Sequence, residues 1–459
     1  MHMPQDAYAR ALAYIFSHAD YARRQPARYA DDVYGVQRVA QLLELLGHPE
    51  TRYPCLHIAG TKGKGSTAAM LEACLRAAGY RTGLFASPSL HTTREYFRIN
   101  GRLLPESRVA AGLDAIRPYV ERVEGITAFE ILTALAFHLF AEEGVEAGII
   151  EVLMGGRLDA TNVITPAVSI ITSISYDHTQ FLGSTLSAIA GEKAGIIKPG
   201  VPVVCAPQEP EALEVIQRVC QEKRAPLVLV GRDWEWRRRA WSPEGETGDI
   251  RAVGAVPAGF PTALQDIRLG LLGAHQWENA AVAVAALAEL CRQGWRIDAE
   301  AVRAGLRDVQ WPGRLEILGR RPWVVVDGAH NVESTVYLVR AVREIFTWNR
   351  LFLIFGASAD KDIAGMLAHL VPLADDIIVT RSGHARAADE ARLQQAVEAL
   401  GKPARTALSV KEALQDLLAQ SSPADMILAT GSLFIAADTR RAWAEITGAP
   451  LPPADPPWS

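Results

Sequence analysis

A short glycine-rich segment near the N-terminus has the composition of a phosphate-binding loop. Residues 60–67 read GTKGKGST and lie between an apolar run at 55–59 (CLHIA) and a helical pattern over 66–78. The loop contains three glycines, Gly60, Gly63 and Gly65. Glycines allow the backbone to bend so that its N–H groups face an anion, and the N-terminus of the following helix adds partial positive charge. The segment therefore predicts a nucleotide site.

Polar side chains of the same loop suit a nucleoside triphosphate with its metal. Lys64 can reach the terminal phosphates, and Ser66, or less readily Thr67, can offer a hydroxyl to Mg²⁺. We expect Thr61 to contact the nucleotide with the rest of the loop. The spacing departs from the common GxxxxGK[ST] pattern, because Gly65 separates Lys64 from the hydroxyl residues. An ordinary strand-to-helix turn with an exposed lysine is the alternative.

Two further polar residues follow apolar runs that are typical of buried strands. Glu151 belongs to the run at 148–152 (GIIEV), and His178 follows the run at 168–174 (VSIITSI). The carboxyl ends of parallel strands meet at one edge of a sheet, where α/β proteins bind ligands. With Ser66, these two side chains form a plausible Mg²⁺ set. The alternative is a capping glutamate and a hydrogen-bonded surface histidine.

A lysine in an apolar context and two charged residues at a domain boundary complete the candidate groups. Lys193 lies on a short helix whose neighbours toward 196–197 are apolar, and a buried lysine is rare without a chemical role. It could instead pair with Glu192. Arg314 lies at the boundary and Asp327 follows the apolar run at 323–326, so both are expected to face a cleft between domains.

The elements that must position these residues alternate between strand and helix. Four short apolar runs before residue 210 are separated by helical stretches, which indicates a parallel sheet covered by helices. A second series of strands begins near 323 and recurs at 351–355, 376–380 and 425–429. The expected fold class is α/β, with a P-loop parallel-sheet ATPase domain and a second, smaller Rossmann-like domain.

Breaks in the pattern set the expected domain limits. WPGR at 311–314 divides an ATP-binding domain at 1–310 from a C-terminal domain at 315–448. The Pro-rich tail at 449–459 is expected to be disordered. The rhythm is lost over 231–272, which fits either a small antiparallel sheet or a surface loop.

Composition excludes several classes of partner. The 459 residues include 47 basic and 52 acidic ones, with a net charge of −5, so no basic field for nucleic acid is present. Neither a signal peptide nor a membrane-spanning stretch is visible in the sequence. Five cysteines in apolar surroundings indicate reduced thiols rather than zinc ligands. We expect a cytoplasmic monomer.

Several segments together resemble one protein family. GTKGKGST, IEVLMGGRLDATN at 150–162 and SYDHTQFLGSTLSAIAGEKAGIIKPG at 175–200 are similar to blocks of the folylpolyglutamate synthase/dihydrofolate synthase family of the Mur ligase superfamily. GAHQWENAA at 273–281, WPGRLE at 311–316, VVVDGAHN at 324–331 and FGASADKD at 355–362 have counterparts in the same order.

The resemblance implies roles for individual residues. Lys64, Lys193 and His178 would be catalytic, Lys193 as a carbamate that supports Mg²⁺. Ser66, Glu151 and His178 would bind the metal. The ATP contacts would come from the loop and from four further residues, Asn279, Arg314, Asp327 and His330. The roles of Lys361 and Asp362 stay open.

The resemblance also implies a reaction. An ATP- and Mg²⁺-dependent ligase of this family joins L-glutamate to dihydropteroate or folate through an acyl phosphate. Three alternatives are a Mur-type ligase for another carboxylate, a P-loop switch protein, and a non-catalytic folate- or nucleotide-binding protein. Leu153 and Met154 replace the Gly-Leu of the family pattern, and Ser89 replaces a histidine, so the choice between the two folate reactions stays open.

Overall fold

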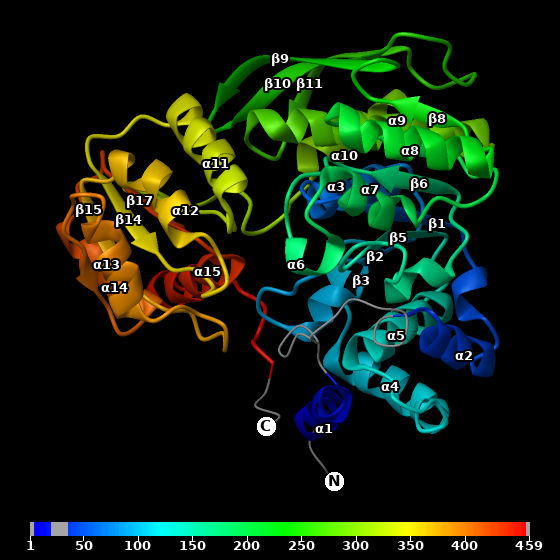
Figure 1. Ribbon diagram of the computed structural model, residues 1–459, viewed down its shortest axis with the longest axis horizontal. Helices are drawn as coiled ribbons and strands as arrows, with labels where there is room; N and C mark the ends of the chain where they lie inside the picture. The colour runs from blue at the N-terminus through cyan, green and yellow to red at the C-terminus, as the bar shows by residue number, and fades with distance from the viewer. Residues whose placement is uncertain (1–3, 20–34, 456–459) are drawn as a thin grey trace.

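Two α/β bodies lie side by side in the computed structural model, which describes residues 4–19 and 35–455. Figure 1 shows the second body at the left, the first at the right, and a small sheet above the space between them. Within the described residues, the model has no helix with both the length and the apolar character needed to cross a bilayer.

The first body is built on an eight-stranded sheet in the order β4-β3-β2-β5-β1-β6-β7-β8. Its strands are Cys55–Ala59 (β1), Thr82–Phe85 (β2), Arg98–Ile99 (β3), Arg102–Leu103 (β4), Ala147–Glu151 (β5), Val168–Ile171 (β6), Val203–Cys205 (β7) and Leu227–Leu229 (β8). All are parallel except β3 and β4, which form an antiparallel edge. The central strands are apolar along their whole length because helices cover both faces.

In the part of the chain that the structure describes, ten helices surround this sheet. They are Pro4–Ser17 (α1), Gln37–Leu45 (α2), Lys64–Ala77 (α3), Glu106–Val120 (α4), Ala128–Glu142 (α5), Thr179–Leu182 (α6), Leu186–Ala194 (α7), Pro210–Lys223 (α8), Ala274–Arg292 (α9) and Ala299–Asp308 (α10). One core lies between the sheet and α3, α9 and α10, and a second lies under α1, α2, α4 and α5. Short 3₁₀ turns occur at Pro49–Thr51, Thr93–Tyr96, Ala160–Val163 and Val371–Leu373.

The region that the sequence left undecided is a three-stranded antiparallel sheet. Its strands are Trp234–Ser242 (β9), Gly245–Ala252 (β10) and Ala263–Leu269 (β11). Glu246 in β10 is completely buried and accepts hydrogen bonds from Arg238 and from the indole N–H of Trp277 in α9. Arg238 also pairs with Glu344 of the second body. The small sheet is therefore held to both bodies by buried charge.

The second body has a six-stranded sheet in the order β12-β13-β17-β14-β15-β16. Its strands are Glu316–Arg320 (β12), Trp323–Val326 (β13), Leu351–Phe355 (β14), Asp376–Val379 (β15), Arg405–Thr406 (β16) and Met426–Thr430 (β17). Its helices are Val332–Ile345 (α11), Ile363–Leu370 (α12), Glu390–Glu398 (α13), Val410–Gln420 (α14) and Leu433–Thr447 (α15). Only β12 is antiparallel to its neighbour. The expected fold class, a P-loop sheet domain with a smaller Rossmann-like domain, is confirmed.

The C-terminal tail was expected to be disordered, but Asp455 within it is anchored by hydrogen bonds. Asp455 accepts hydrogen bonds from the hydroxyls of Tyr8, Thr92 and Thr93, and from the backbone N–H of Thr93. Several donors around one carboxylate offset the entropy lost when the chain is ordered. The prediction is therefore wrong for Asp455, and residues 456–459 lie outside the described part of the chain.

Candidate active site

The phosphate loop connects β1 to α3 at the carboxyl edge of the first sheet. Gly63 has a φ of 85° directly before α3, and a Cβ there would lie 2.2 Å from Oδ1 of Asn279. Gly60 has a φ of 149°, and its Cβ would lie 1.9 Å from Oγ1 of Thr172. Only glycine fits this combination of backbone angle and close approach. Asn279 therefore packs directly against the loop.

The loop is fastened to the segment that follows β6. The backbone N–H groups of Thr61 and Lys62 both donate to the carbonyl of Ser173, at 2.8 and 3.2 Å. The hydroxyl of Thr61 donates to the carbonyl of Ser175 at 3.1 Å. The N–H groups of Thr61 and Lys62 are therefore occupied by a contact within the protein. The N–H groups available to an anion are those of the first turn of α3, which have no acceptor within the helix.

Two lysines converge on one carbonyl of the loop. Nζ of Lys64 donates to the carbonyl of Gly60 at 3.2 Å, and Nζ of Lys193 donates to the same oxygen at 2.8 Å. Lys193 lies on α7 and is only 4% exposed. Burial, with the charge of Lys64, lowers its pKa well below the ordinary value. The alternative that Lys193 pairs with Glu192 is wrong, since Glu192 pairs with Arg157.

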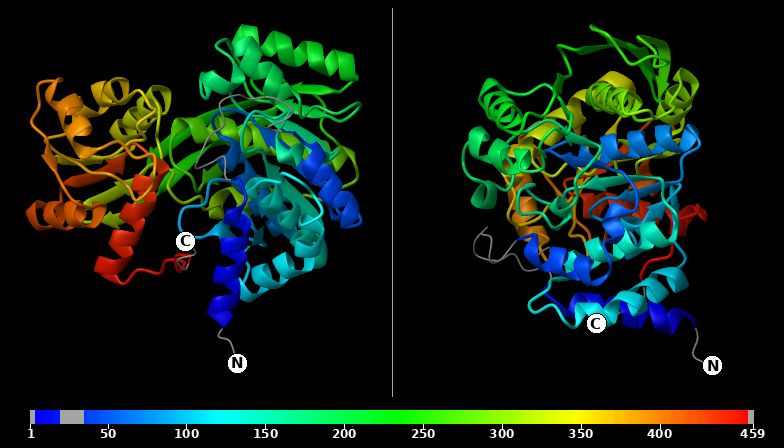
Figure 2. Two further views of the ribbon diagram at one scale, coloured as in Figure 1. Left: turned by 60° about the horizontal axis from the view of Figure 1, so that its bottom comes forward. Right: turned by 90° about the vertical axis from the view of Figure 1, so that its right-hand side faces the viewer.

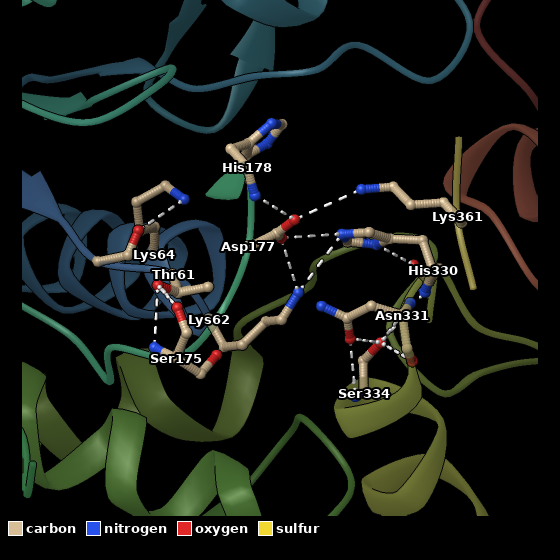
Figure 3. Close-up of polar contacts among 12 residues, drawn as sticks. Thr61, Lys62, Lys64, Ser175, Asp177, His178, His330, Asn331, Ser334 and Lys361 are labelled. Carbon is tan, nitrogen blue, oxygen red and sulfur yellow. Dashed lines mark hydrogen bonds and ion pairs between the residues drawn. The ribbon is translucent and has the colours of Figure 1, made fainter. Parts of the chain in front are cut away.

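An acidic residue that the sequence analysis did not single out joins the two bodies. Oδ2 of Asp177 lies 3.2 Å from Nζ of Lys62, and Oδ1 lies 3.4 Å from Nζ of Lys361 in the second body (Figure 3). Burial alone would raise the pKa of Asp177, but the charges of Lys62 and Lys361 hold it far below the ordinary value. Asp177 is thus an ionised centre between phosphate loop and second body.

His330 takes part in this contact as a neutral ring. Its Nδ1 lies 2.9 Å from the carbonyl of Gly328 and donates to it, so Nε2 is the acceptor facing Nζ of Lys62 at 3.4 Å. Burial and the charge of Lys62 lower the pKa of His330. The 3.7 Å separation between Nε2 and Asp177 is therefore a polar contact rather than an ion pair.

The predicted metal residues have the chemistry of a magnesium site. Burial raises the pKa of Glu151 to about 7, against the charges of Lys64 and Arg314, and its carboxylate accepts one long hydrogen bond, 3.4 Å from the N–H of Ser87. Burial lowers the pKa of His178 to about 4, which keeps its ring neutral, and in Figure 3 the ring points away from Asp177. A buried carboxylate with a single weak donor and a neutral imidazole both suit a cation.

Few side chains of the protein are available to bind Mg²⁺ at this site. Within residues 4–19 and 35–455, no three His, Cys, Asp or Glu side chains gather as a metal site. Ser66 is buried at the start of α3, and the buried Thr67 hydroxyl has no hydrogen-bond partner among the described residues. Mg²⁺ usually takes one or two protein oxygens and completes its shell with water and substrate phosphate. The residues present fit that mode of binding.

Substitution of the two candidate ligands is expected to change the metal requirement. Glu151→Gln and His178→Ala should each raise the Mg²⁺ concentration for half-maximal turnover by about tenfold or more, because each removes a donor to the cation. A Mg²⁺ titration of ATP-dependent phosphate release measures this. Glu289→Gln is the matched control, since Glu289 is also buried but pairs only with Arg292. Unchanged titrations for both variants would show that these residues are structural.

The remaining predicted contacts line the junction of the bodies. Burial raises the pKa of both Glu151 and Asp327, and the charge of Arg314 opposes that rise at each carboxylate. The two oxygens of Asp327 accept the N–H groups of Leu315 and Ala329, both at 2.8 Å. Asp327 therefore holds the link between the bodies in this structure.

Two residues whose roles were open are now placed. Lys361 reaches Asp177 across the junction, whereas Asp362 accepts the N–H of Gly365 and caps α12. Lys62 and Asp177 are two candidate site residues that sequence reasoning missed. Both stand inside the segments GTKGKGST and SYDH, beside residues that were singled out. Lys62 and Asp177 are charged and lie beside Lys64 and His178 in the sequence, and this could have identified them as candidate site residues.

The departures at Leu153 and Met154 leave the backbone of the site organised. Their N–H groups both donate to Oδ2 of Asp159 at 3.0 Å, and Oδ1 of Asp159 accepts the hydroxyl of Thr161. The main chain is held by this carboxylate whatever the two side chains are. Leu153 and Met154 therefore change the side chains at the surface of the site and leave its backbone hydrogen bonds in place.

The arrangement suits transfer of a phosphoryl group. Lys62, Lys64 and Lys193 come from the first body and Lys361 from the second, and Arg314 lies on the segment that connects α10 to β12. Figure 3 shows Lys62 and Lys361 on either side of Asp177. Positive groups placed around a transferring phosphate stabilise its charge without covalent participation by the protein.

Comparison with known proteins agrees with this geometry. Residues 58–287 match the Mur ligase middle domain, and residues 313–433 match the Mur ligase, glutamate ligase domain. The chain is 36% identical over 414 residues to the dihydrofolate synthase/folylpolyglutamate synthase of Bacillus subtilis, covering 89% of this chain and 94% of that protein.

Solved structures are similar over both bodies. Mycobacterium tuberculosis folylpolyglutamate synthase complexed with ADP superposes with a TM-score of 0.85 at 32% identity, covering 96% of this chain and 99% of that one. E. coli FolC in complex with DHPP and ADP gives a TM-score of 0.82 at 30% identity, covering 95% and 98%. This chain therefore belongs to the folylpolyglutamate synthase/dihydrofolate synthase family of Mur ligases.

Proposed function

We propose that the protein is an ATP-dependent ligase that adds L-glutamate to dihydropteroate, to a reduced folate, or to both, through an acyl phosphate. The observation that carries the proposal is the junction of the bodies, where the loop lysines, Asp177 and Lys361 enclose the place of a terminal phosphate. Similarity to relatives with this activity over nearly the whole chain supports it.

The reaction joins a carboxylate to an amine in two displacements. An oxygen of the carboxylate attacks the γ-phosphorus, and ADP leaves. The amine nitrogen of glutamate then attacks the acyl carbon, loses a proton, and inorganic phosphate leaves. Lys64 at the first turn of α3 and Arg314 neutralise the charge of the transferring phosphoryl group. Closure of the bodies positions the reactants and excludes water.

Mg²⁺ belongs to the proposal as a cation held by Glu151, His178 and Ser66, and when bound it would neutralise phosphate charge. ATP is bound by the loop together with Asn279, Arg314, Asp327 and His330. The free state of all five cysteines supports a reducing location such as the cytoplasm. We also propose that the protein acts as a monomer, divided into two domains near 311–314.

A substrate comparison tests the function. The enzyme is incubated with ATP, Mg²⁺ and L-glutamate, and with either dihydropteroate or tetrahydrofolate. Phosphate release is followed and the products are identified by mass spectrometry. Glutamylated product with both substrates is the expected result, because the same acyl-phosphate chemistry serves either carboxylate. Product from only one of the two substrates would assign the enzyme to that reaction alone. Product with neither, while another carboxylate reacts, would overturn the folate assignment and retain the ligase.

A further inference from the structure

The described part of the C-terminal tail contacts a loop of the first body through Asp455. Figure 1 and Figure 2 show the chain leaving α15 and running to α1. Asp455 lies there among four donors: N–H and Oγ1 of Thr93 at 2.8 and 2.6 Å, Oγ1 of Thr92 at 2.6 Å, and the hydroxyl of Tyr8 at 2.9 Å. Both carboxylate oxygens are therefore satisfied by residues 362 or more positions away in the chain.

A second contact between the same parts lies close by in sequence. Arg440 of α15 donates to Nε2 of the buried His91 and pairs with Glu316 of β12 at 3.0 Å. Burial and the charge of Arg440 lower the pKa of His91 to about 3, so the ring stays a neutral acceptor. Residues 91–93 are thus bound by Arg440 of the second body and by Asp455 of the tail.

The segment that receives these contacts, residues 87–95, reaches the candidate metal site at its other end. The N–H of Ser87 donates to Oε2 of Glu151 at 3.4 Å. Glu95 accepts the N–H groups of Leu90 and His91, at 2.9 and 3.0 Å, and so folds the segment onto itself. Because it is tied internally, a shift at Thr93 would be passed on toward Ser87.

Sheet order indicates which substrate this segment adjoins. Two residues assigned to the nucleotide lie on the β6 side of the phosphate loop: Asn279 lies on α9, which packs against β6 and β7, and His330 lies 3.7 Å from Asp177, which follows β6. Segment 87–95 follows β2, which is on the other side of β5 from β1. In phosphoryl transfer the attacking oxygen and the leaving ADP are in line on opposite sides of the phosphorus. The carboxylate substrate therefore approaches from the side of segment 87–95.

We propose that Asp455 is a positioning residue that holds segment 87–95 against the carboxylate substrate when the two bodies are together. The proposal rests on the proposed ligase function and adds to it a role for the tail. Loss of the carboxylate frees four donors and loosens the segment, so binding of the carboxylate substrate weakens while the nucleotide side is untouched.

Steady-state kinetics of the full-length enzyme test this role. Asp455→Ala and the conservative Asp455→Asn should each raise KM for the carboxylate substrate about tenfold. Loss of a hydrogen bond to a charged group changes an equilibrium constant by about that factor or more. KM for ATP should stay within about twofold. Hydrogen exchange in residues 87–95 should become faster in both variants. Glu445→Gln is the matched control, because Glu445 lies on α15 and pairs with the exposed Lys411.

A double variant separates positioning from general destabilisation. Thr93→Val removes one donor to Asp455, so Asp455→Ala combined with Thr93→Val should be no worse than Asp455→Ala alone. An unchanged KM for the carboxylate, or equal changes in both KM values together with a lower melting temperature, would overturn the proposal. The wild-type enzyme is assayed alongside with whichever carboxylate it ligates, so absence of folate activity in wild type counts against the proposed substrate and not against Asp455.

Discussion

Replacement of Lys64 by alanine is expected to reduce turnover by about 10²–10³-fold or more while the fold stays intact, as for loss of a group that stabilises transition-state charge. Nζ of Lys64 lies at the N-terminal turn of α3, 3.2 Å from the carbonyl of Gly60, where the phosphate of a bound nucleotide would give it a partner of opposite charge. Its charge matters most when the γ-phosphoryl group moves, so kcat should fall more than the affinity for ATP.

The measurement is the initial rate of ADP and phosphate formation with saturating carboxylate, glutamate and Mg²⁺. Thermal unfolding of the same preparation verifies the fold. Lys411→Ala serves as control, because Lys411 is exposed and pairs only with Glu445. Near-normal turnover in a folded Lys64→Ala enzyme would contradict the assignment of residues 60–67 as the phosphate loop.

The second large effect is expected at Lys193. Its amine is buried, its pKa is lowered by burial and by Lys64 and Lys62, and a neutral amine is the form that adds CO₂ to give a carbamate and a proton. Conversion of this lysine to an anion would also relieve repulsion among the three lysines. Lys193→Ala should lower turnover by about 10- to 100-fold, as removal of a group supporting a metal ligand does.

Three observations test the carbamate. Short carboxylic acids should partly rescue Lys193→Ala, ¹³CO₂ should give a carbamate signal in wild type, and a well-resolved experimental structure should show extra density on Nζ. The control is Lys198→Ala, since Lys198 follows α7 but donates to the carbonyl of Asn162 instead of the loop. Plain lysine density together with an active Lys193→Ala enzyme would refute the carbamate.

Much of the site could be predicted from local sequence because its residues end apolar strands. The runs at 55–59 and 148–152 became β1 and β5 almost residue for residue, since fully apolar segments of this length are stable only between two helical layers. The phosphate loop then had to lie at the carboxyl edge, and Glu151 with it. The region over 231–272 was not predictable in the same way, because its strands carry many charged residues between the few inward-facing apolar ones, such as Ile250 and Leu264. One inward-facing position holds a carboxylate, Glu246, whose partner Trp277 lies on α9.

The sequence by itself determined the strand-and-helix order, the loop at 60–67 and the chemical types of the candidate groups, because these depend on neighbours a few residues apart. Only the tertiary structure showed that Asp177 joins Lys62 to Lys361 and that Lys193 shares the Gly60 carbonyl with Lys64. It likewise brought Asp455 to Thr93. Such pairs are set by how helices and sheets pack, and long-range ion pairs between ordinary charged residues leave no periodic signal in the chain.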